Sequence, residues 1–271
     1  MLPNGIWTGL SNAKGRTLDR IDRVRGRDAG LRPPRHLQFV GSGDFERVGE
    51  LFLDYFIEFG GLEPQHRVLD IGCGIGRMAI PLTGYLSPRG SYEGVDIVPD
   101  GIEWCSENIS GRFPNFRFTL ADIRNEAYRA DGQTAGSEYT FEFPDAEFDF
   151  VLLTSVFTHM LPADVENFLA EISRLLKPGG RCFTTWYLLN EESERLCRAG
   201  QAQPEFKHAI GDYLTADPDV PESAIAHKES RVMNWYRKFS LDKALTVRYG
   251  SWCGRDSFLS HQDICVSAKQ G

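Results

Sequence analysis

The stretch from Val68 to Arg77, VLDIGCGIGR, decides the fold of this chain. It begins with an apolar run that holds one acid, Asp70, and such a run is typical of a buried parallel strand. Glycines at alternate positions follow, and they predict a tight turn in which the backbone adopts positive φ and approaches a ligand closely. Apolar residues with helical spacing start directly after Gly76. A strand, a glycine turn and a helix start form, in this order, a geometry that receives a nucleotide-like ligand.

A second stretch, Tyr92 to Ile97 (YEGVDI), predicts the next strand and carries Asp96 near its end. An acid about 20 residues beyond a glycine turn can accept hydrogen bonds from ribose hydroxyls. The glycine turn alone would be weak evidence, but the full order of strand, turn, helix, strand and terminal acid predicts a nucleoside site.

The composition fits a globular chain of one large domain or of one domain with a cap. The chain has 271 residues, 41% of them hydrophobic, which is enough for a full core. Its formal net charge of −8 argues against a nucleic-acid binder that relies on a broad basic surface.

The cysteine pattern and the absence of targeting signals predict a cytoplasmic protein. Six cysteines are scattered without a C-x-x-C pair, so we expect buried free thiols and neither disulfides nor a zinc site. No run of about 18 apolar residues is present, and the N-terminus lacks the apolar core of a signal peptide.

From residue 67 onward the patterns alternate between strand and helix. The expected strands are 67–71, 91–97, 116–121, 148–154, 181–188, 246–252 and 263–268. Helices are expected from Arg77, from about Pro99 and from Pro162. The repeated strand–helix units predict an α/β fold with a doubly wound, mostly parallel seven-stranded sheet and an antiparallel edge strand.

Four segments stand outside this alternation. Residues 1–35 are rich in arginine and glycine, and we interpret them as a flexible basic arm in front of a domain over 36–271. Residues 36–66 predict a hinge at 39–45, with Ser42 or Asp44 as helix cap, and then a helix. Residues 128–144 predict a surface loop with a short hairpin or edge strand at 139–143. Residues 191–245 interrupt the alternation with proline and aromatic residues, and we interpret them as a largely helical substrate cap.

These features resemble the class I S-adenosylmethionine-dependent methyltransferases. The resemblance rests on VLDIGCGIG at 68–76, GVDI at 94–97, AD at 121–122, FDFVLL at 148–153 and LLKPGG at 175–180. It covers roughly residues 45–190 and the closing strand pair. It is specific for the cofactor and not for the methyl acceptor.

The resemblance implies a role for each matching position. Asp70 and the turn at Gly72, Gly74 and Gly76 would hold the methionine part of S-adenosylmethionine. Asp96 would bind both ribose hydroxyls, and Ile97 would pack on the adenine. Asp122 would accept a hydrogen bond from the adenine amino group, with Ile123 beside it, and Thr154 or Ser155 would lie near the methionine or the acceptor.

Two other classes of function remain as alternatives. A dinucleotide-dependent oxidoreductase has a G-x-G-x-x-G turn, whereas here the glycines are at 72, 74 and 76 with an acid two positions ahead. That acid would suit the ammonium group of a methionine better than a pyrophosphate. A binding protein without catalysis on the same fold is the other alternative.

His159 is the candidate catalytic residue, because it follows the fourth strand directly and an imidazole can act as a base near neutral pH. A structural histidine that fixes the loop is the alternative. Candidate acceptor contacts are Ser155, Trp186, Tyr187, Trp252 and His261. Thr154 and Ser155 stand where metal-dependent members of the family carry acids, so we predict no metal.

The acceptor is the least determined part of the prediction. The N-P-P-Y type motif of DNA and glutamine N-methyltransferases is absent after the fourth strand. We therefore favour O-methylation of a sugar, glycolipid or secondary-metabolite hydroxyl. N-methylation of a small amine and methylation of a protein side chain are the alternatives. We expect no nucleic-acid partner and no membrane span. The oligomeric state stays open, with a dimer as one option.

Overall fold

The structure is a computed structural model that describes residues 15–16, 19, 30–38 and 43–271. Most of the predicted 1–35 arm, and the hinge residues Phe39 to Ser42, therefore lie outside the described residues.

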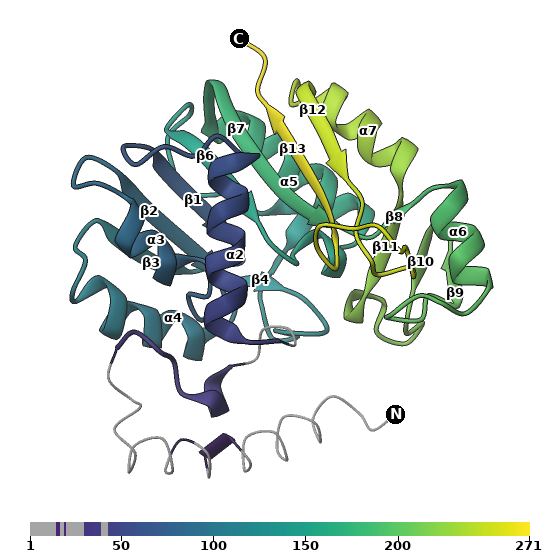
Figure 1. Ribbon diagram of the computed structural model, residues 1–271, viewed down its shortest axis with the longest axis horizontal. Coiled ribbons are helices and arrows are strands. Elements are labelled where there is room, and N and C mark those ends of the chain that lie inside the picture. The colour runs from purple at the N-terminus through teal and green to yellow at the C-terminus, as the bar shows by residue number, and fades with distance from the viewer. Residues whose placement is uncertain (1–14, 17–18, 20–29, 39–42) are drawn as a thin grey trace.

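Within the described residues, seven strands form one sheet in the order β12-β13-β7-β6-β1-β2-β3 (Figure 1). Their bounds are β1 Arg67–Ile71, β2 Ser91–Asp96, β3 Phe116–Leu120, β6 Phe148–Leu153, β7 Leu176–Trp186, β12 Lys243–Arg248 and β13 Asp263–Ala268. Neighbours pair in parallel from β3 to β7, and β13 pairs antiparallel with both β7 and β12. The predicted seven-stranded, mostly parallel sheet with an antiparallel edge is confirmed.

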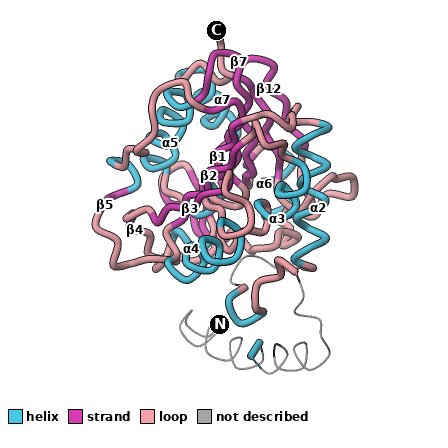
Figure 2. The backbone as a smooth tube through the Cα atoms, turned by 90° about the vertical axis from the view of Figure 1, so that its left-hand side faces the viewer, coloured by secondary structure: helices cyan, strands magenta, loops and turns pink. Residues whose placement is uncertain are grey.

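Helices cover both faces of this sheet, as Figure 2 shows with α5 on one side and α2 and α3 on the other. One face packs against α5 (Pro162–Leu175) and α7 (Glu229–Lys238). The other packs against α2 (Phe45–Glu58), α3 (Ala79–Tyr85) and α4 (Pro99–Cys105), which a π-helical turn, η2 (Ser106–Ser110), continues. Because both faces are covered, strands such as β1 and β6 are buried almost along their whole length.

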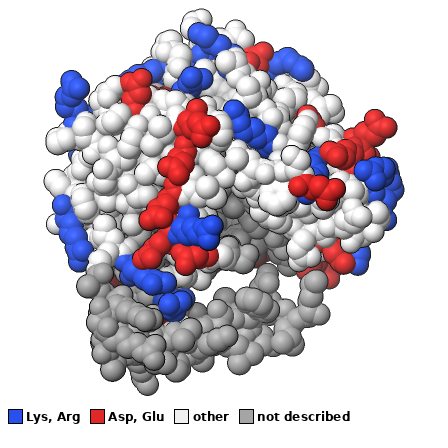
Figure 3. All heavy atoms as spheres, viewed as in Figure 1, with Lys and Arg blue, Asp and Glu red and all other residues white. Residues whose placement is uncertain are grey.

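Helix α2 shows why the sequence folds locally as predicted. The Asp44 side chain accepts a hydrogen bond of 3.0 Å from the Arg47 backbone N–H and so caps the first turn. Tyr55 and Phe56 are buried on the sheet side, while the acids Glu46, Glu50, Asp54 and Glu58 follow one exposed line. Figure 3 shows these acidic side chains as a row over α2.

Two segments differ from their sequence-based interpretation. Residues 139–143 form no hairpin or edge strand; the short strands of this region are β4 (Ile123–Arg124) and β5 (Thr134–Ala135), followed by the 3-10 turn η3 (Gly136–Glu138). The Phe141 ring is buried against Phe168 of α5. Burial of the Phe141 ring, and not strand pairing, therefore holds this segment, although its alternating apolar pattern suggested a strand.

The segment after β7 contains strands as well as the expected helices. It contains the helices α6 (Glu191–Arg198) and α7, the 3-10 turn η5 (Pro221–Ser223) and the strands β9 (His208–Ile210), β10 (Tyr213–Thr215) and β11 (Ile225–Lys228). With β8 (Leu188–Leu189) these strands form a second sheet in the order β8-β11-β10-β9. A separate apolar cluster that includes Tyr187, Phe206 and Trp252 packs with this region.

Candidate functional site

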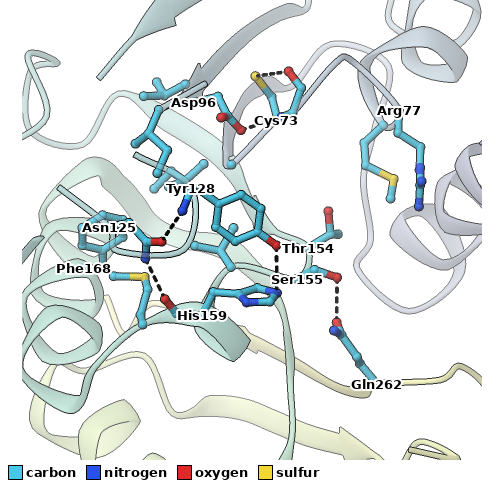
Figure 4. Close-up of a pocket in the computed structure, with 18 of the residues that line it drawn as sticks. Cys73, Arg77, Asp96, Asn125, Tyr128, Thr154, Ser155, His159, Phe168 and Gln262 are labelled. Atoms are coloured by element: carbon cyan, nitrogen blue, oxygen red, sulfur yellow. Dashed lines mark hydrogen bonds between the residues drawn. The ribbon is translucent and has the colours of Figure 1, made fainter. Parts of the chain in front are cut away.

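A cavity of about 740 Å³ opens at the carboxyl ends of β1, β2 and β6. Residues of α2, of the loop 251–262 and of the 3-10 turn η4 (Phe157–His159) complete its wall. The carboxyl edge of a parallel sheet is where open α/β folds bind ligands. Figure 4 shows how side chains from these separate segments point toward one another.

The glycine turn after β1 forms one end of the cavity. Gly72, Gly74 and Gly76 all have positive φ, at +83°, +56° and +79°. A Cβ atom at Gly72 would lie 2.2 Å from Cγ2 of Val156, and one at Gly76 would lie 2.8 Å from Cδ1 of Ile109. Only glycine therefore fits this turn. Gly72 and Gly74 line the cavity. Gly76 lies behind it, where the absence of a side chain lets Ile109 pack closely.

Asp96 at the end of β2 holds the turn and faces the cavity. Its Oδ2 accepts a hydrogen bond of 2.7 Å from the Gly74 N–H, and its Oδ1 accepts one of 2.9 Å from the Val98 N–H. The residue is 8% exposed, and burial raises the pKa of its carboxyl although these N–H groups act in the opposite direction. Ile97 lines the cavity beside it.

Asp70 does not line the cavity, because it is fully buried behind the glycine turn. Its Oδ2 accepts a hydrogen bond of 2.5 Å from the Tyr92 hydroxyl, while its Oδ1 has no partner among the described residues. Burial raises the pKa of this carboxyl to about 7. The structure therefore gives Asp70 a place under the turn and no direct access to a ligand.

Asp122 also lies outside the cavity lining. Its carboxylate contacts the Arg129 guanidinium at 3.1 Å, and half of its side chain is exposed. Ala121, Ile123, Arg124 and Asn125 line the cavity, and Asp122 between them does not. Among these, Ile123 is the predicted residue that reaches the site.

His159 lies in the cavity wall with a defined tautomer. Its Nδ1 is 2.9 Å from the carbonyl oxygen of Glu222, which can only accept, so Nδ1 carries the proton. Its Nε2 is then unprotonated and lies 3.4 Å from the Tyr128 hydroxyl (Figure 4). Burial lowers the pKa of His159, so the imidazole is neutral at pH 7.

Two residues that sequence reasoning missed hold His159 in place. Asn125 donates its Nδ2–H to the His159 carbonyl at 2.9 Å and to the Glu222 carboxylate at 3.0 Å. The other carboxylate oxygen of Glu222 accepts from the Glu126 N–H at 3.0 Å. Glu222 is 97 positions from Asn125, and no local pattern announces such a contact.

A third missed residue, Gln262, joins the loop before β13 to β6 and β7. Its Oε1 accepts hydrogen bonds from the Ser155 hydroxyl at 3.0 Å and from the Thr185 hydroxyl at 2.6 Å. The Thr185 oxygen in turn accepts from the Ser155 N–H at 2.7 Å. Ser155 has φ +61°, so this network fixes a turn that a serine rarely adopts. Thr154, Ser155 and Gln262 all line the cavity.

The aromatic acceptor candidates separate into two groups. Tyr187 and His261 line the cavity. Trp186 and Trp252 do not, since both are fully buried. Their indole N–H groups donate to Thr184 Oγ1 and to Asp263 Oδ2, each within 2.7 Å, and these bonds let the whole side chain enter the core. The expectation that these two tryptophans contact an acceptor is therefore corrected to a packing role.

The described part of the chain carries neither a metal cluster nor a membrane span. No group of three or more His, Cys, Asp or Glu side chains there could hold a metal ion. None of the described helices has the length and apolar character needed to span a membrane.

Comparison with known proteins identifies a domain in this chain. Residues 69–184 match a family model described as a methyltransferase domain. The fatty-acid O-methyltransferase of Mycolicibacterium smegmatis is 32% identical over 148 residues, which are 54% of this chain and 42% of that protein. The tRNA N(3)-cytidine methyltransferase METTL2 of Gallus gallus is 28% identical over 163 residues, which are 57% and 39% of the two chains. This chain thus spans about two fifths of the length of these curated relatives.

Solved structures share the fold. The PH0226 protein of Pyrococcus horikoshii OT3 superposes with a TM-score of 0.57 at 18% identity and covers 86% of this chain and 95% of its own.

Proposed function

Since the chain belongs, through the domain at residues 69–184, to the class I S-adenosylmethionine-dependent methyltransferases, we propose that it methylates a hydroxyl group of a small molecule. The proposal rests above all on one observation. A single cavity combines the glycine turn and Asp96 with a neutral histidine whose Nε2 carries a lone pair.

The residues at the turn fit the cofactor of this family. Gly72 and Gly74 line the cavity without side chains, so a ligand can approach the backbone closely there, and Asp96 presents carboxylate oxygens where ribose hydroxyls could donate to them. Ile97 and Ile123 offer an apolar slot for the adenine, and Thr154 borders the methionine end. We leave Asp70 and Asp122 out of the contact set because neither lines the cavity.

His159 would act as the general base. The cofactor supplies an electrophilic methyl group when it is bound. The acceptor hydroxyl must then lose a proton as its oxygen attacks, and Nε2 of His159 can take that proton. The Glu222 carbonyl, which accepts from Nδ1–H, also stabilises the imidazolium that results. Positioning of the acceptor in line with the methyl group supplies much of the remaining acceleration.

This arrangement favours oxygen over nitrogen as the methylated atom. A neutral amine attacks with its own lone pair and needs no base beforehand, whereas a hydroxyl benefits from one. Relatives of this chain carry names of both kinds, among them a fatty-acid O-methyltransferase and phosphoethanolamine N-methyltransferases. N-methylation of a small amine, or methylation of a protein side chain, is therefore the second candidate.

We also propose that residues 191–245 act as a cap within a domain over residues 36–271. Glu222 supports this role, because it lies in the segment and contacts His159 through its carbonyl and Asn125 through its carboxylate. The cap would thus complete the acceptor side of the cavity.

A paired substrate panel tests the proposal. The purified chain is incubated with S-adenosylmethionine and matched alcohols and amines of equal carbon skeleton, and S-adenosylhomocysteine release is measured. We expect transfer to the alcohols that depends on an unprotonated histidine. Transfer restricted to the amines would replace the first candidate by the second, and absence of cofactor binding would refute both.

A further inference from the structure

Large apolar side chains stay exposed at the mouth of the cavity. Among the described residues, the exposed large hydrophobic side chains are Leu51, Ile57, Leu120, Tyr128, Tyr249 and Phe258. Three of these six line the cavity: Leu51 at 42% exposed, Tyr128 at 46% and Phe258 at 57%. Apolar groups that gather in this way mark a site for an apolar ligand.

Two chain segments build this wall together. Helix α2 contributes Val48, Leu51 and Phe52 to the cavity lining, and the loop before β13 contributes Phe258 and Leu259. The Tyr55 hydroxyl of α2 donates a hydrogen bond of 2.9 Å to the Leu259 carbonyl and ties the segments to each other. The apolar wall therefore extends from α2 to the loop, and the two segments are in direct contact.

This wall lies away from the nucleoside end of the cavity. Arg77 packs next to α2, since its carbonyl oxygen is 2.5 Å from where a Cβ of Gly49 would be. Figure 4 shows Arg77 and Gln262 on the other side of the cavity from Asp96 and Asn125. The cofactor-type contacts and the apolar wall thus occupy different sides.

We infer that the methyl acceptor is an amphiphile, a hydroxyl compound with a straight hydrocarbon chain that lies along Val48, Leu51, Phe52, Phe258 and Leu259. The inference rests on the proposed function and names its substrate class. A free sugar would lose its hydration against this wall without gaining hydrogen bonds in return. A hydrocarbon chain loses nothing there, and its hydroxyl end reaches the region of His159.

A homologous series of alkane-1,2-diols, from hexane-1,2-diol to dodecane-1,2-diol, tests the inference below the micelle concentration. Calorimetry measures binding to protein saturated with S-adenosylhomocysteine, and S-adenosylhomocysteine release measures transfer from S-adenosylmethionine. Affinity should rise about fourfold per added methylene, which corresponds to the roughly 0.8 kcal/mol of a buried CH₂.

Variants assign the effect to the wall. Leu51→Gln and Phe258→Gln should each weaken binding of dodecane-1,2-diol about tenfold and leave that of hexane-1,2-diol within about twofold, because only the longer chain reaches the wall. Ile57→Gln is the matched control, because Ile57 lies on the same helix, is 37% exposed and does not line the cavity. It should keep the affinities of the original chain.

The outcomes separate the two proposals. Affinity that is independent of chain length, or no binding of any diol, would overturn the amphiphile inference even where S-adenosylmethionine binds and short alcohols are methylated. A protein that fails to bind S-adenosylmethionine would instead refute the proposed function.

Discussion

Replacing His159 by asparagine tests the proposed base with little change in shape. The side-chain amide of asparagine can occupy the place of Nδ1 and still donate to the Glu222 carbonyl, which now accepts at 2.9 Å. The variant no longer has Nε2, the atom that would take the proton. The fold and the cofactor end should therefore be preserved.

The position of His159 sets the size of the expected effect. A positioned general base contributes roughly 10²–10⁴-fold to a rate, so kcat for an alcohol acceptor should fall by that factor. Affinity for S-adenosylmethionine should stay nearly constant, because the substitution leaves Asp96 and the glycine turn unchanged. Burial lowers the pKa of His159, so the original chain should keep constant kcat/KM above pH 7 and lose activity toward acid pH.

Stopped-time assays of S-adenosylhomocysteine release give kcat and kcat/KM between about pH 5 and pH 9, a range that brackets the ordinary histidine pKa. Calorimetry measures the affinity for S-adenosylmethionine. The His159→Asn variant should lack the acid limb of the profile. Tyr128→Phe is the companion variant, since it removes the hydroxyl beside Nε2 and leaves the imidazole. A His159→Asn protein with full activity, or with the same acid limb, would refute the base role and leave the histidine a structural one.

Three further perturbations follow from the site. Asp96→Ala should weaken S-adenosylmethionine binding more than about tenfold in calorimetry, because charge-assisted hydrogen bonds contribute about 1.5–3 kcal/mol each; unchanged affinity would remove the ribose assignment. Gly72→Ala should cost more unfolding free energy in urea than Gly179→Ala, since both glycines have φ near +80° but only the first meets a neighbour, Cγ2 of Val156; equal losses would mean that backbone strain alone decides. Burial raises the pKa of Asp70 to about 7 from 3.8, so its effect on stability is most favourable below pH 3.8 and is lost as pH rises through 7. Asp70→Asn should therefore raise the melting temperature more at about pH 8 than at about pH 4, and the opposite order in a melting series would contradict the burial argument.

The sheet could be predicted because its strands are buried on both faces. The apolar runs of β1 and β13 have the bounds that the sequence predicts, 67–71 and 263–268. For β7 the structure begins at Leu176, five residues before the predicted start at Arg181. The register against β6 shifts between Phe148 and Phe150, so an irregularity lets the chain pair through a stretch that glycine and proline suggested was a turn.

The site could be predicted only where one segment carries it. The glycine turn and Asp96 are close in the sequence, and both are found where the pattern suggested. Glu222 and Gln262 act through contacts 97 and 107 positions apart, which depend on how the second sheet and the last loop pack. The sequence predicts a pocket wall at Trp252, because it is an aromatic residue in a glycine-rich turn. Its indole N–H instead donates to Asp263, and this bond lets the side chain lie in the core.

The proposed chemistry depends on a cavity that holds S-adenosylmethionine at the glycine turn. Isothermal titration of the purified chain with S-adenosylmethionine, S-adenosylhomocysteine and NAD measures this property. We predict one saturable site for the first two compounds, weakened in Asp96→Ala, and no heat of binding with NAD. Binding of NAD together with indifference to S-adenosylmethionine would contradict the assignment.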